Sequence, residues 1–250
     1  MSSVDKSSEK VRRMFAQIAP RYDLMNHVLS LNIDKLWRSR TLKQLDLSGD
    51  SPVLDVCTGT GDLAISIFKQ AAGRFRVVGT DFCLPMLELA RKKQSNQPAF
   101  DGEFVSFIEA DTQSLPFQEN TFQAVTVAFG IRNVSDTLSG LHEMVRVCQP
   151  GGQVAVLEFS RPTWPVLKQV YDTYFRWILP AIGQAVARNS ESAYSYLPES
   201  VRQFPSGPAM VKILESVGLQ NVRSWPMTFG VATLYIGQKR CFEKNDERIN

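Results

Sequence analysis

The sequence of 250 residues predicts an α/β fold: a doubly wound, mostly parallel sheet of seven strands, preceded by helices and interrupted by a helical insertion. A short apolar run at 53–57 leads into the glycine-rich turn 58–61 and then into an amphipathic stretch, as in a βα unit. Strand-like and helix-like stretches alternate from there to residue 159. Two last runs, 222–227 and 231–237, indicate a closing hairpin. Together these patterns favour a Rossmann-like sheet.

Helices are expected before the first strand. Apolar residues follow helical spacing from 11 to 18 until Pro20 ends the helix, and a second helix opens at 22–27. Two interpretations of this region stay open: helices packed on the edge of the sheet, or a lid over a pocket. We treat residues 1–45 as an N-terminal helical lid.

The core of the sheet is expected within residues 46–160. Its further strands are predicted at 75–81, 104–110, 122–129 and 153–159, with helices at 84–91 and 136–148. The run 122–129 is apolar almost throughout, which is typical of a central strand that is buried on both faces. His142 lies in the middle of a helix and is assigned a structural role.

Residues 161–200 break the alternation. Aromatic and apolar side chains crowd the stretch 164–182, which predicts a helix, and a tyrosine-rich loop is expected at 194–200. Three uses of 164–182 stay open: a wall for a lipid-like substrate, a face resting on a membrane, or contact with a second subunit in a homodimer. Residues 201–240 supply a helix at 209–217 and the hairpin, and 241–250 form a tail.

Composition excludes several classes of protein. The net charge of +3 and the lack of a dense Lys/Arg run argue against a nucleic-acid partner. The polar N-terminus is unlike a signal peptide, and no apolar run is long enough to span a bilayer. The four cysteines are scattered, without metal-ligand spacing, and are expected to be reduced thiols. We therefore expect a cytoplasmic protein without a metal, peripheral at most to the inner face of a membrane.

The glycine-rich turn is the strongest chemical signal. Strand, tight turn and helix N-terminus together direct backbone N–H groups at a ligand, and the run from Gly59 to Ala64 fits the dinucleotide pattern. Asp55 and Asp62 flank the turn, where they would repel a pyrophosphate and attract a cation. S-adenosylmethionine carries an ammonium and a sulfonium but no phosphate. The acids therefore favour this cofactor over a dinucleotide.

Three strand ends carry further candidate residues. Asp81 follows the second strand, where an acid can accept both ribose hydroxyls of an adenosine. Asp111 follows the third strand and can meet an adenine amino group; a helix N-cap is the alternative. Arg132 and Asn133 follow the central strand, where a guanidinium needs an anion or a polarised oxygen. The alternative for Arg132 is a salt bridge to a carboxylate of the lid.

With these motifs collected, the chain resembles a known family: the class I methyltransferases that C-methylate quinone precursors in ubiquinone and menaquinone biosynthesis. The most specific matches are Tyr22–Asn26 and Phe129–Val134, and the resemblance extends from about residue 10 to residue 240. Weaker or shorter matches are 54–62, 79–81, 114–117, 150–152, 157–160, 196–200 and 204–205. Ala128 stands where the ubiquinone branch usually has a serine that contacts the cofactor, and 32–35 replaces a segment that often holds Gly and His.

The resemblance implies a cofactor, S-adenosylmethionine, and a set of site residues. The expected cofactor-binding residues are Asp55, Gly59, Thr60, Gly61, Asp81, Phe82, Asp111, Thr112 and Ala128. The expected catalytic residues are Arg132, Asn133 and Tyr22. Arg132 is too basic to accept a proton, so it is expected to stabilise a phenolate or to orient a water with Asn133. His27 and Tyr22 are the weaker candidates for the proton acceptor.

The predicted reaction is C-methylation of a reduced prenylated quinone, most simply a demethylmenaquinol with a prenyl or phytyl tail. A polyprenyl benzoquinol is the alternative substrate. Two alternatives come from other classes: an NAD(P)-dependent reductase, which would share the glycine turn, and a non-enzymatic quinone- or lipid-binding protein. A nucleic-acid methyltransferase would share the core but would need a basic groove.

Overall fold

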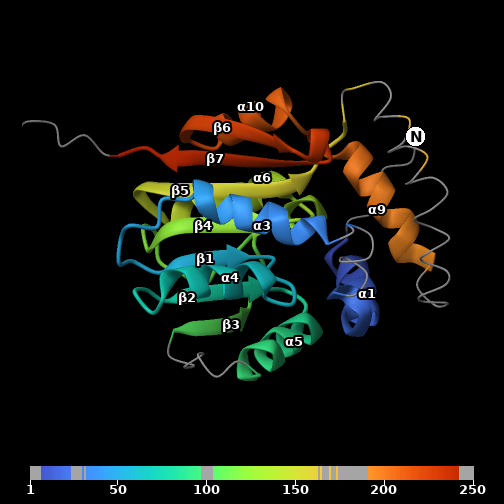
Figure 1. Cartoon of the computed structure of the whole chain (residues 1–250), viewed down its shortest axis with the longest axis horizontal. Coiled ribbons are helices and arrows are strands. Elements are labelled where there is room, and N and C mark those ends of the chain that lie inside the picture. The colour runs from blue at the N-terminus through green and yellow to red at the C-terminus, as the bar shows by residue number, and fades with distance from the viewer. Residues whose placement is uncertain are drawn as a thin grey trace, which may run out of the picture.

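A sheet of seven strands forms the centre of the molecule in the computed structural model, which describes residues 7–23, 30, 32–96, 104–162, 164, 169, 173 and 191–241 (Figure 1). The strand order is β3-β2-β1-β4-β5-β7-β6. The strands are β1 (Val53–Val56), β2 (Val77–Asp81), β3 (Val105–Glu109), β4 (Phe122–Ala128), β5 (Cys148–Phe159), β6 (Leu219–Met227) and β7 (Ala232–Lys239). Strands β1 to β5 pair in parallel, whereas β7 pairs antiparallel with both β5 and β6. The predicted fold class is confirmed.

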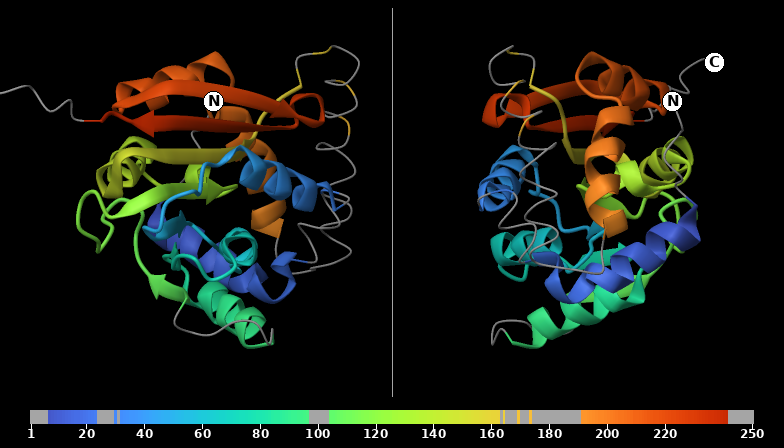
Figure 2. Two further views of the ribbon diagram at one scale, coloured as in Figure 1. Left: turned by 60° about the vertical axis from the view of Figure 1, so that its left-hand side comes forward. Right: turned by 90° about the vertical axis from the view of Figure 1, so that its right-hand side faces the viewer.

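Helices cover both faces of the sheet. One face carries α3 (Ile33–Gln44), α4 (Asp62–Ala71) and α5 (Leu84–Ser95), and the other carries α6 (Thr137–Val147) and α10 (Pro208–Ser216). The described part of the chain also has the short 3-10 helices η1 (Ala19–Arg21), η2 (Ile131–Asn133) and η4 (Thr228–Gly230). The other described α-helices, α1 (Ser8–Ile18) and α9 (Glu191–Gln203), stand at the end of the sheet to which the parallel strands point (Figure 1), and the right-hand view of Figure 2 looks onto this end.

Strand β1 shows why the sheet forms between these two layers. All four of its residues are buried, and alternate side chains point to opposite faces. Val53 packs with the cluster under α3 and α4, while Leu54 and Val56 pack with the cluster under α6 and α10. A strand that is apolar on both faces is stable only between two helical layers. The chain therefore reaches the carboxyl end of the sheet with Asp55 fully enclosed.

Two sequence predictions about elements are wrong. Residues 194–200 are not a loop but part of α9, although Pro198 lies inside that helix. Its last turns are held by Glu199, which pairs with Arg202 at 2.6 Å and accepts from Gln203 at 2.7 Å. The domain boundary expected between residues 200 and 201 falls inside this helix. Strand β5 begins at Cys148, so the turn expected at 150–152 is an irregularity within the strand, with Gly151 at φ +76°.

Some predictions concern parts of the chain outside the described residues. These are the second N-terminal helix beyond Asp23, with His27, and nearly all of the aromatic stretch 164–182. The three uses of that stretch, the lid and the cellular location all stay predictions. Among the helices that the structure describes, none is both long and apolar enough to cross a membrane. All four cysteines are free thiols, as expected.

Candidate functional site

A cleft opens at the carboxyl ends of β1, β2 and β4, the edge at which open α/β sheets bind ligands. The empty volume of the cleft, including the open solvent at its mouth, is about 600 Å³. Residues from the sheet and from the N-terminal helices line it: Phe15, Tyr22, Cys57, Gly59, Asp81, Phe82, Met86, Asp111, Thr112, Gln113, Phe129, Gly130, Asn133, Val134 and Ser135. Seven of the twelve predicted site residues are among them: Tyr22, Gly59, Asp81, Phe82, Asp111, Thr112 and Asn133.

Asp81 joins the glycine-rich turn to the end of β2. Its Oδ2 accepts the backbone N–H of Gly59 at 2.8 Å, and its Oδ1 accepts that of Cys83 at 2.9 Å. Burial raises the pKa of Asp81 to about 6. Gly59 can make this turn because its φ of +57° lies in the left-handed region that favours glycine. Each carboxylate oxygen keeps a further lone pair, so Asp81 can still accept hydroxyl groups from a ligand in the cleft.

Asp111 and Thr112 continue the wall of the cleft beyond β3. Asp111 does not cap a helix: its Oδ1 accepts the N–H of Gln113 at 2.9 Å, which closes a local turn. The hydroxyl of Thr112 lies 3.3 Å from the Cys57 sulfur. Phe82 and Met86 supply apolar surface on the same side. The arrangement can hold a flat, mostly apolar ring between Phe82, Met86 and an acid at its rim.

Asp55 and Asp62, the two acids from which the sequence analysis predicted a cationic ligand, do not line the cleft. Asp55 lies within the sheet, where its carboxylate accepts hydrogen bonds from Thr58 at 2.6 Å and Thr126 at 2.7 Å, and burial raises its pKa to about 6. Asp62 pairs with Arg38 at 2.8 Å and with Lys93 at 2.6 Å. Neither residue lines the cleft. The carboxylates that do line it belong to Asp81 and Asp111, so the argument for a cationic ligand rests on them.

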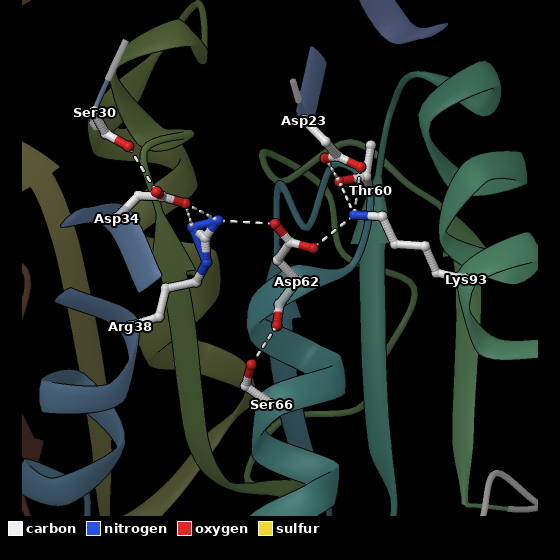
Figure 3. Close-up of polar contacts among 8 residues, drawn as sticks. All are labelled: Asp23, Ser30, Asp34, Arg38, Thr60, Asp62, Ser66 and Lys93. Carbon is white, nitrogen blue, oxygen red and sulfur yellow. Dashed lines mark hydrogen bonds and ion pairs between the residues drawn. The ribbon is translucent and has the colours of Figure 1, made fainter. Parts of the chain in front are cut away.

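Thr60, Gly61 and Ala128 also lie outside the lining. The Thr60 hydroxyl donates to Asp23 at 2.6 Å and accepts from Lys93 at 2.8 Å, so its proton is already committed to Asp23 and is not offered to a cofactor (Figure 3). A Cβ added at Gly61 would stand only 2.8 Å from the Phe107 ring. Close packing against this ring is therefore a sufficient reason for glycine at this position. Ala128 pairs with β5 and packs against the hydrophobic core. The predicted cofactor contacts of these three residues stay predictions.

Arg132 and Asn133 form part of η2, directly after β4. Asn133 lines the cleft, whereas Arg132 lies beneath its wall and is buried. Its Nη1 pairs with Oε1 of Glu158 at 2.8 Å and also contacts the Phe129 carbonyl, while its guanidinium carbon lies 5.2 Å from the Phe159 ring centre. Arg132 therefore pairs with a carboxylate of β5, and not with a carboxylate of the N-terminal lid as the alternative prediction expected. Arg132 Nε and Asn133 Oδ1 are buried without a hydrogen-bond partner in the described part of the chain.

Glu158 is a site residue that the sequence analysis missed. It is fully buried, and burial raises its pKa although Arg132 opposes that shift. The backbone N–H of Phe159 donates to the same Oε1 at 2.8 Å. A carboxylate inside an otherwise apolar strand is costly unless it is paired, and this was the signal in the run 153–159 that could have revealed it.

Comparison with known proteins identifies the family of the chain. The sequence profile described as the ubiE/COQ5 methyltransferase family matches residues 3–239. A ubiquinone/menaquinone biosynthesis C-methyltransferase UbiE from Geobacter sp. (strain M21) is 44% identical over 239 residues, which cover 96% of this chain and 100% of that protein. A demethylmenaquinone methyltransferase from Staphylococcus aureus (strain JH9) is 38% identical, over 96% of this chain and 97% of that one.

Solved structures support the fold. A SAM-dependent methyltransferase from Thermotoga maritima superposes with a TM-score of 0.63 at 15% identity, covering 92% of this chain and 100% of that one. Haemonchus contortus phosphoethanolamine N-methyltransferase 2, in complex with S-adenosyl-L-methionine, gives 0.57 at 16% identity, over 81% and 52%. The match to a methyltransferase family over residues 3–239 gives S-adenosylmethionine as the cofactor, and neither the reductase nor the binding-protein alternative is favoured. The chain belongs to the ubiE/COQ5 methyltransferase family.

Proposed function

We propose that this enzyme transfers a methyl group to a ring carbon of a reduced prenylated quinone, and that the ring is a demethylmenaquinol. The family match and the names of the relatives support a quinone precursor as the acceptor. The name of one group of relatives specifies demethylmenaquinone, and the name of the other covers both quinones. No contact at the site favours the benzoquinol alternative.

The observation that carries this proposal is the pair of unsatisfied polar atoms at the end of β4. A buried polar group without a partner costs free energy, and such groups gather where a ligand completes them. Arg132 Nε is a donor and Asn133 Oδ1 is an acceptor. A phenolic hydroxyl both accepts and donates, so it offers the kind of partner that each of these atoms lacks.

Arg132 then acts on the charge of that oxygen. Attack from a ring carbon requires electron density beside a hydroxyl, and partial transfer of the phenolic proton to solvent water supplies it. Once the methyl group is attached, the proton of the same ring carbon also passes to water, and aromaticity returns. The guanidinium stabilises the developing phenolate by donating from Nε, and it cannot itself take the proton because it stays protonated. Glu158 holds the other side of the guanidinium, through Nη1, and so fixes the direction in which Nε points.

Aromatic rings beside Arg132 suit a flat bicyclic acceptor. Phe129 lines the cleft, and its ring centre lies 4.5 Å from that of Phe159 and 5.8 Å from that of Trp37. Such groups present a rigid apolar face at small entropic cost. A naphthoquinol offers more area to this face than a benzoquinol, which supports it as the preferred ring.

The methyl-donor end of the cleft fits S-adenosylmethionine. Asp81 offers free lone pairs to ribose hydroxyls, and Phe82, Met86 and Asp111 offer a slot with an acid at its rim. When bound, the cofactor supplies a methyl group activated by a positively charged sulfur. The residues of the chain bind and orient the two partners, and positioning of this kind supplies much of the rate enhancement.

Methyl transfer to two acceptors tests the choice of ring. The assay measures incorporation of radiolabelled methyl from S-adenosylmethionine into reduced demethylmenaquinone and into the matching benzoquinol. We expect a kcat/KM at least tenfold higher for the naphthoquinol, since each extra buried CH₂-sized group contributes about 0.8 kcal/mol. A higher value for the benzoquinol would overturn the proposed ring, and no incorporation into either would overturn the proposed acceptor class.

Arg132→Ala tests the role of the guanidinium. We expect kcat to fall by about 100-fold or more, as on removal of an oxyanion donor, while the affinity for S-adenosylhomocysteine stays near that of the native enzyme. The double variant Arg132→Met/Glu158→Gln removes both charges and therefore spares the fold the cost of an unpaired buried carboxylate. If this double variant were folded and fully active, Arg132 would have no part in the reaction.

A further inference from the structure

A second polar cluster lies behind the glycine-rich turn, outside the lining of the cleft (Figure 3). We call it the Lys93 cluster and define it by four residues: Asp23, Thr60, Asp62 and Lys93. They come from separate elements, since Asp23 follows η1, Thr60 is in the turn, Asp62 begins α4 and Lys93 belongs to α5. Behind it, Arg38 of α3 joins Asp62 to Asp34, with Nη2 distances of 2.8 Å to each.

Lys93 connects all of the elements in this cluster. Its Nζ lies 2.7 Å from Asp23, 2.8 Å from the Thr60 hydroxyl and 2.6 Å from Asp62. The ammonium donates hydrogen bonds to the Thr60 hydroxyl and to Asp62, and it forms an ion pair with Asp23. Thr60 adds a bond of its own to Asp23 at 2.6 Å. The segment that ends in Asp23 is therefore tied to the turn by both a charge and a hydroxyl.

The contacts of Asp23 matter for the cofactor because the neighbouring residue, Tyr22, lines the cleft. Tyr22 lines the cleft and lies opposite Gly59, where its Cε1 would be 3.9 Å from a Cβ on that glycine. Gly59 is in turn bonded to Asp81. The turn is thus held from one side by Asp81 and from the other by the Lys93 cluster, with Tyr22 across the space between.

We propose that Lys93 is a positioning residue for the methyl donor: it fastens the segment 19–23 to the glycine-rich turn and so holds Tyr22 over the cofactor end of the cleft. This inference rests on S-adenosylmethionine as the cofactor, and not on the quinol or on Arg132. Coupling between two such events is reciprocal, so cofactor binding also tightens the attachment of the segment.

The exposure of the cluster separates this role from a merely structural one. The side chains of Lys93, Asp23 and Asp62 are 28%, 31% and 31% exposed. Ion pairs in contact with water contribute little to global stability. A loss of Lys93 should therefore appear in the affinity for the cofactor and leave the unfolding temperature nearly unchanged.

The test compares Lys93→Met with Lys92→Met. Lys92 is the adjacent lysine of α5 and is exposed, so the control removes the same charge from the same helix. Binding of S-adenosylhomocysteine to the full chain is measured by calorimetry, and unfolding by thermal scan. We expect Kd to rise roughly tenfold for Lys93→Met, as is usual for coupled sites, and to stay unchanged for Lys92→Met. Lys93→Arg should restore part of the affinity.

Asp23→Asn provides a second variant if Lys93→Met does not fold. It keeps a carbonyl oxygen for Thr60 but removes the charge that faces Lys93, so we expect a smaller rise in Kd of the same origin. The double variant Asp23→Asn/Lys93→Met should bind no more weakly than Lys93→Met alone. Equal Kd values for Lys93→Met and Lys92→Met would overturn the proposal, as would an unchanged Kd for Asp23→Asn. Failure of the quinol to be methylated would leave this binding measurement unaffected.

Discussion

Two ion-paired clusters stand at the carboxyl end of the sheet, and they differ in their contact with water. The side chains of Arg132 and Glu158 are only 6% and 1% exposed, between β4 and β5. The three charged side chains of the Lys93 cluster are about one third exposed, between the N-terminal segment, the glycine-rich turn and α5. The first pair lies under the proposed acceptor end of the cleft, and the second lies behind its cofactor end.

The difference teaches what each cluster can do. A buried pair is costly to break, because the remaining charge has no water to solvate it, so it holds Arg132 in one orientation. A half-exposed pair contributes little to stability and exchanges readily with water, so it can open and close with a ligand. On the proposed assignment of the site, the acceptor end of the cleft is thus the fixed one and the cofactor end the releasable one.

The largest expected effect is that of Glu158→Ala on stability. The substitution leaves the Arg132 guanidinium buried without its carboxylate, and we expect the free energy of unfolding to fall by about 3–5 kcal/mol. Urea unfolding at pH 7 measures this change. Glu109→Ala is the control, because Glu109 pairs with Arg12 at the surface, where a pair contributes at most about 1 kcal/mol. Equal losses for the two variants would contradict the contrast between buried and exposed pairs.

A smaller effect is expected from Asp55, a buried acid held by hydroxyl groups. Burial raises its pKa from 3.8 to about 6, so between these values the folded chain keeps a proton that the unfolded chain has released. The contribution of Asp55 to stability therefore falls as pH rises through this window, by an amount on the order of 2–3 kcal/mol. Asp55→Asn lacks this contribution.

Unfolding by urea at pH 4, 5, 6 and 7 checks the prediction for Asp55. The stability of the native chain relative to Asp55→Asn should decrease steadily from pH 4 to pH 7. Asp50→Asn, which removes the same charge at an exposed position, is the matched control. Parallel curves for the native chain and Asp55→Asn would show that Asp55 titrates as it does in the unfolded chain.

The smallest expected effect is that of salt. At 1 M ionic strength the Debye length is about 3 Å. The ion pairs of the partly exposed Lys93 cluster should therefore weaken, whereas the buried Arg132–Glu158 pair should not. We expect the Kd for S-adenosylhomocysteine to rise roughly threefold between 0.05 and 1 M NaCl in the native enzyme. The Kd of Lys93→Met should hardly respond. If the Kd of Lys93→Met rose with salt as much as that of the native enzyme, the salt effect would not come from the Lys93 cluster.

Much of the fold could be predicted because its signals are local. The apolar run of β1, the left-handed glycines and the amphipathic helix α4 each depend on near neighbours in sequence, and so do the acids at strand ends. The helix α9 could not be predicted in the same way. Pro198 and the tyrosines indicate a loop, but burial of Ser200, Val201 and Phe204 against the rest of the chain overrides that preference.

The candidate site divides along the same line. Asp81, Asp111 and Asn133 were predicted and do line the cleft, because the carboxyl ends of parallel strands meet at one edge. Lys93 could not be chosen over Lys92, since nothing in sequence distinguishes two adjacent lysines at the end of a helix. The two lysines differ only in the direction of their side chains: Lys93 meets three polar partners, and Lys92 is exposed to water.

By itself the sequence determined the order of the elements, the glycine-rich turn and the placing of acids at the ends of strands. These features follow from hydrophobic periodicity and from turn chemistry, which act over a few residues. The tertiary structure alone decided which charges pair: Arg132 with Glu158, 26 residues later, and Lys93 with Asp62, 31 residues earlier. Such partners are set by packing between distant segments, and the burial that packing creates decides whether a pair is fixed or releasable.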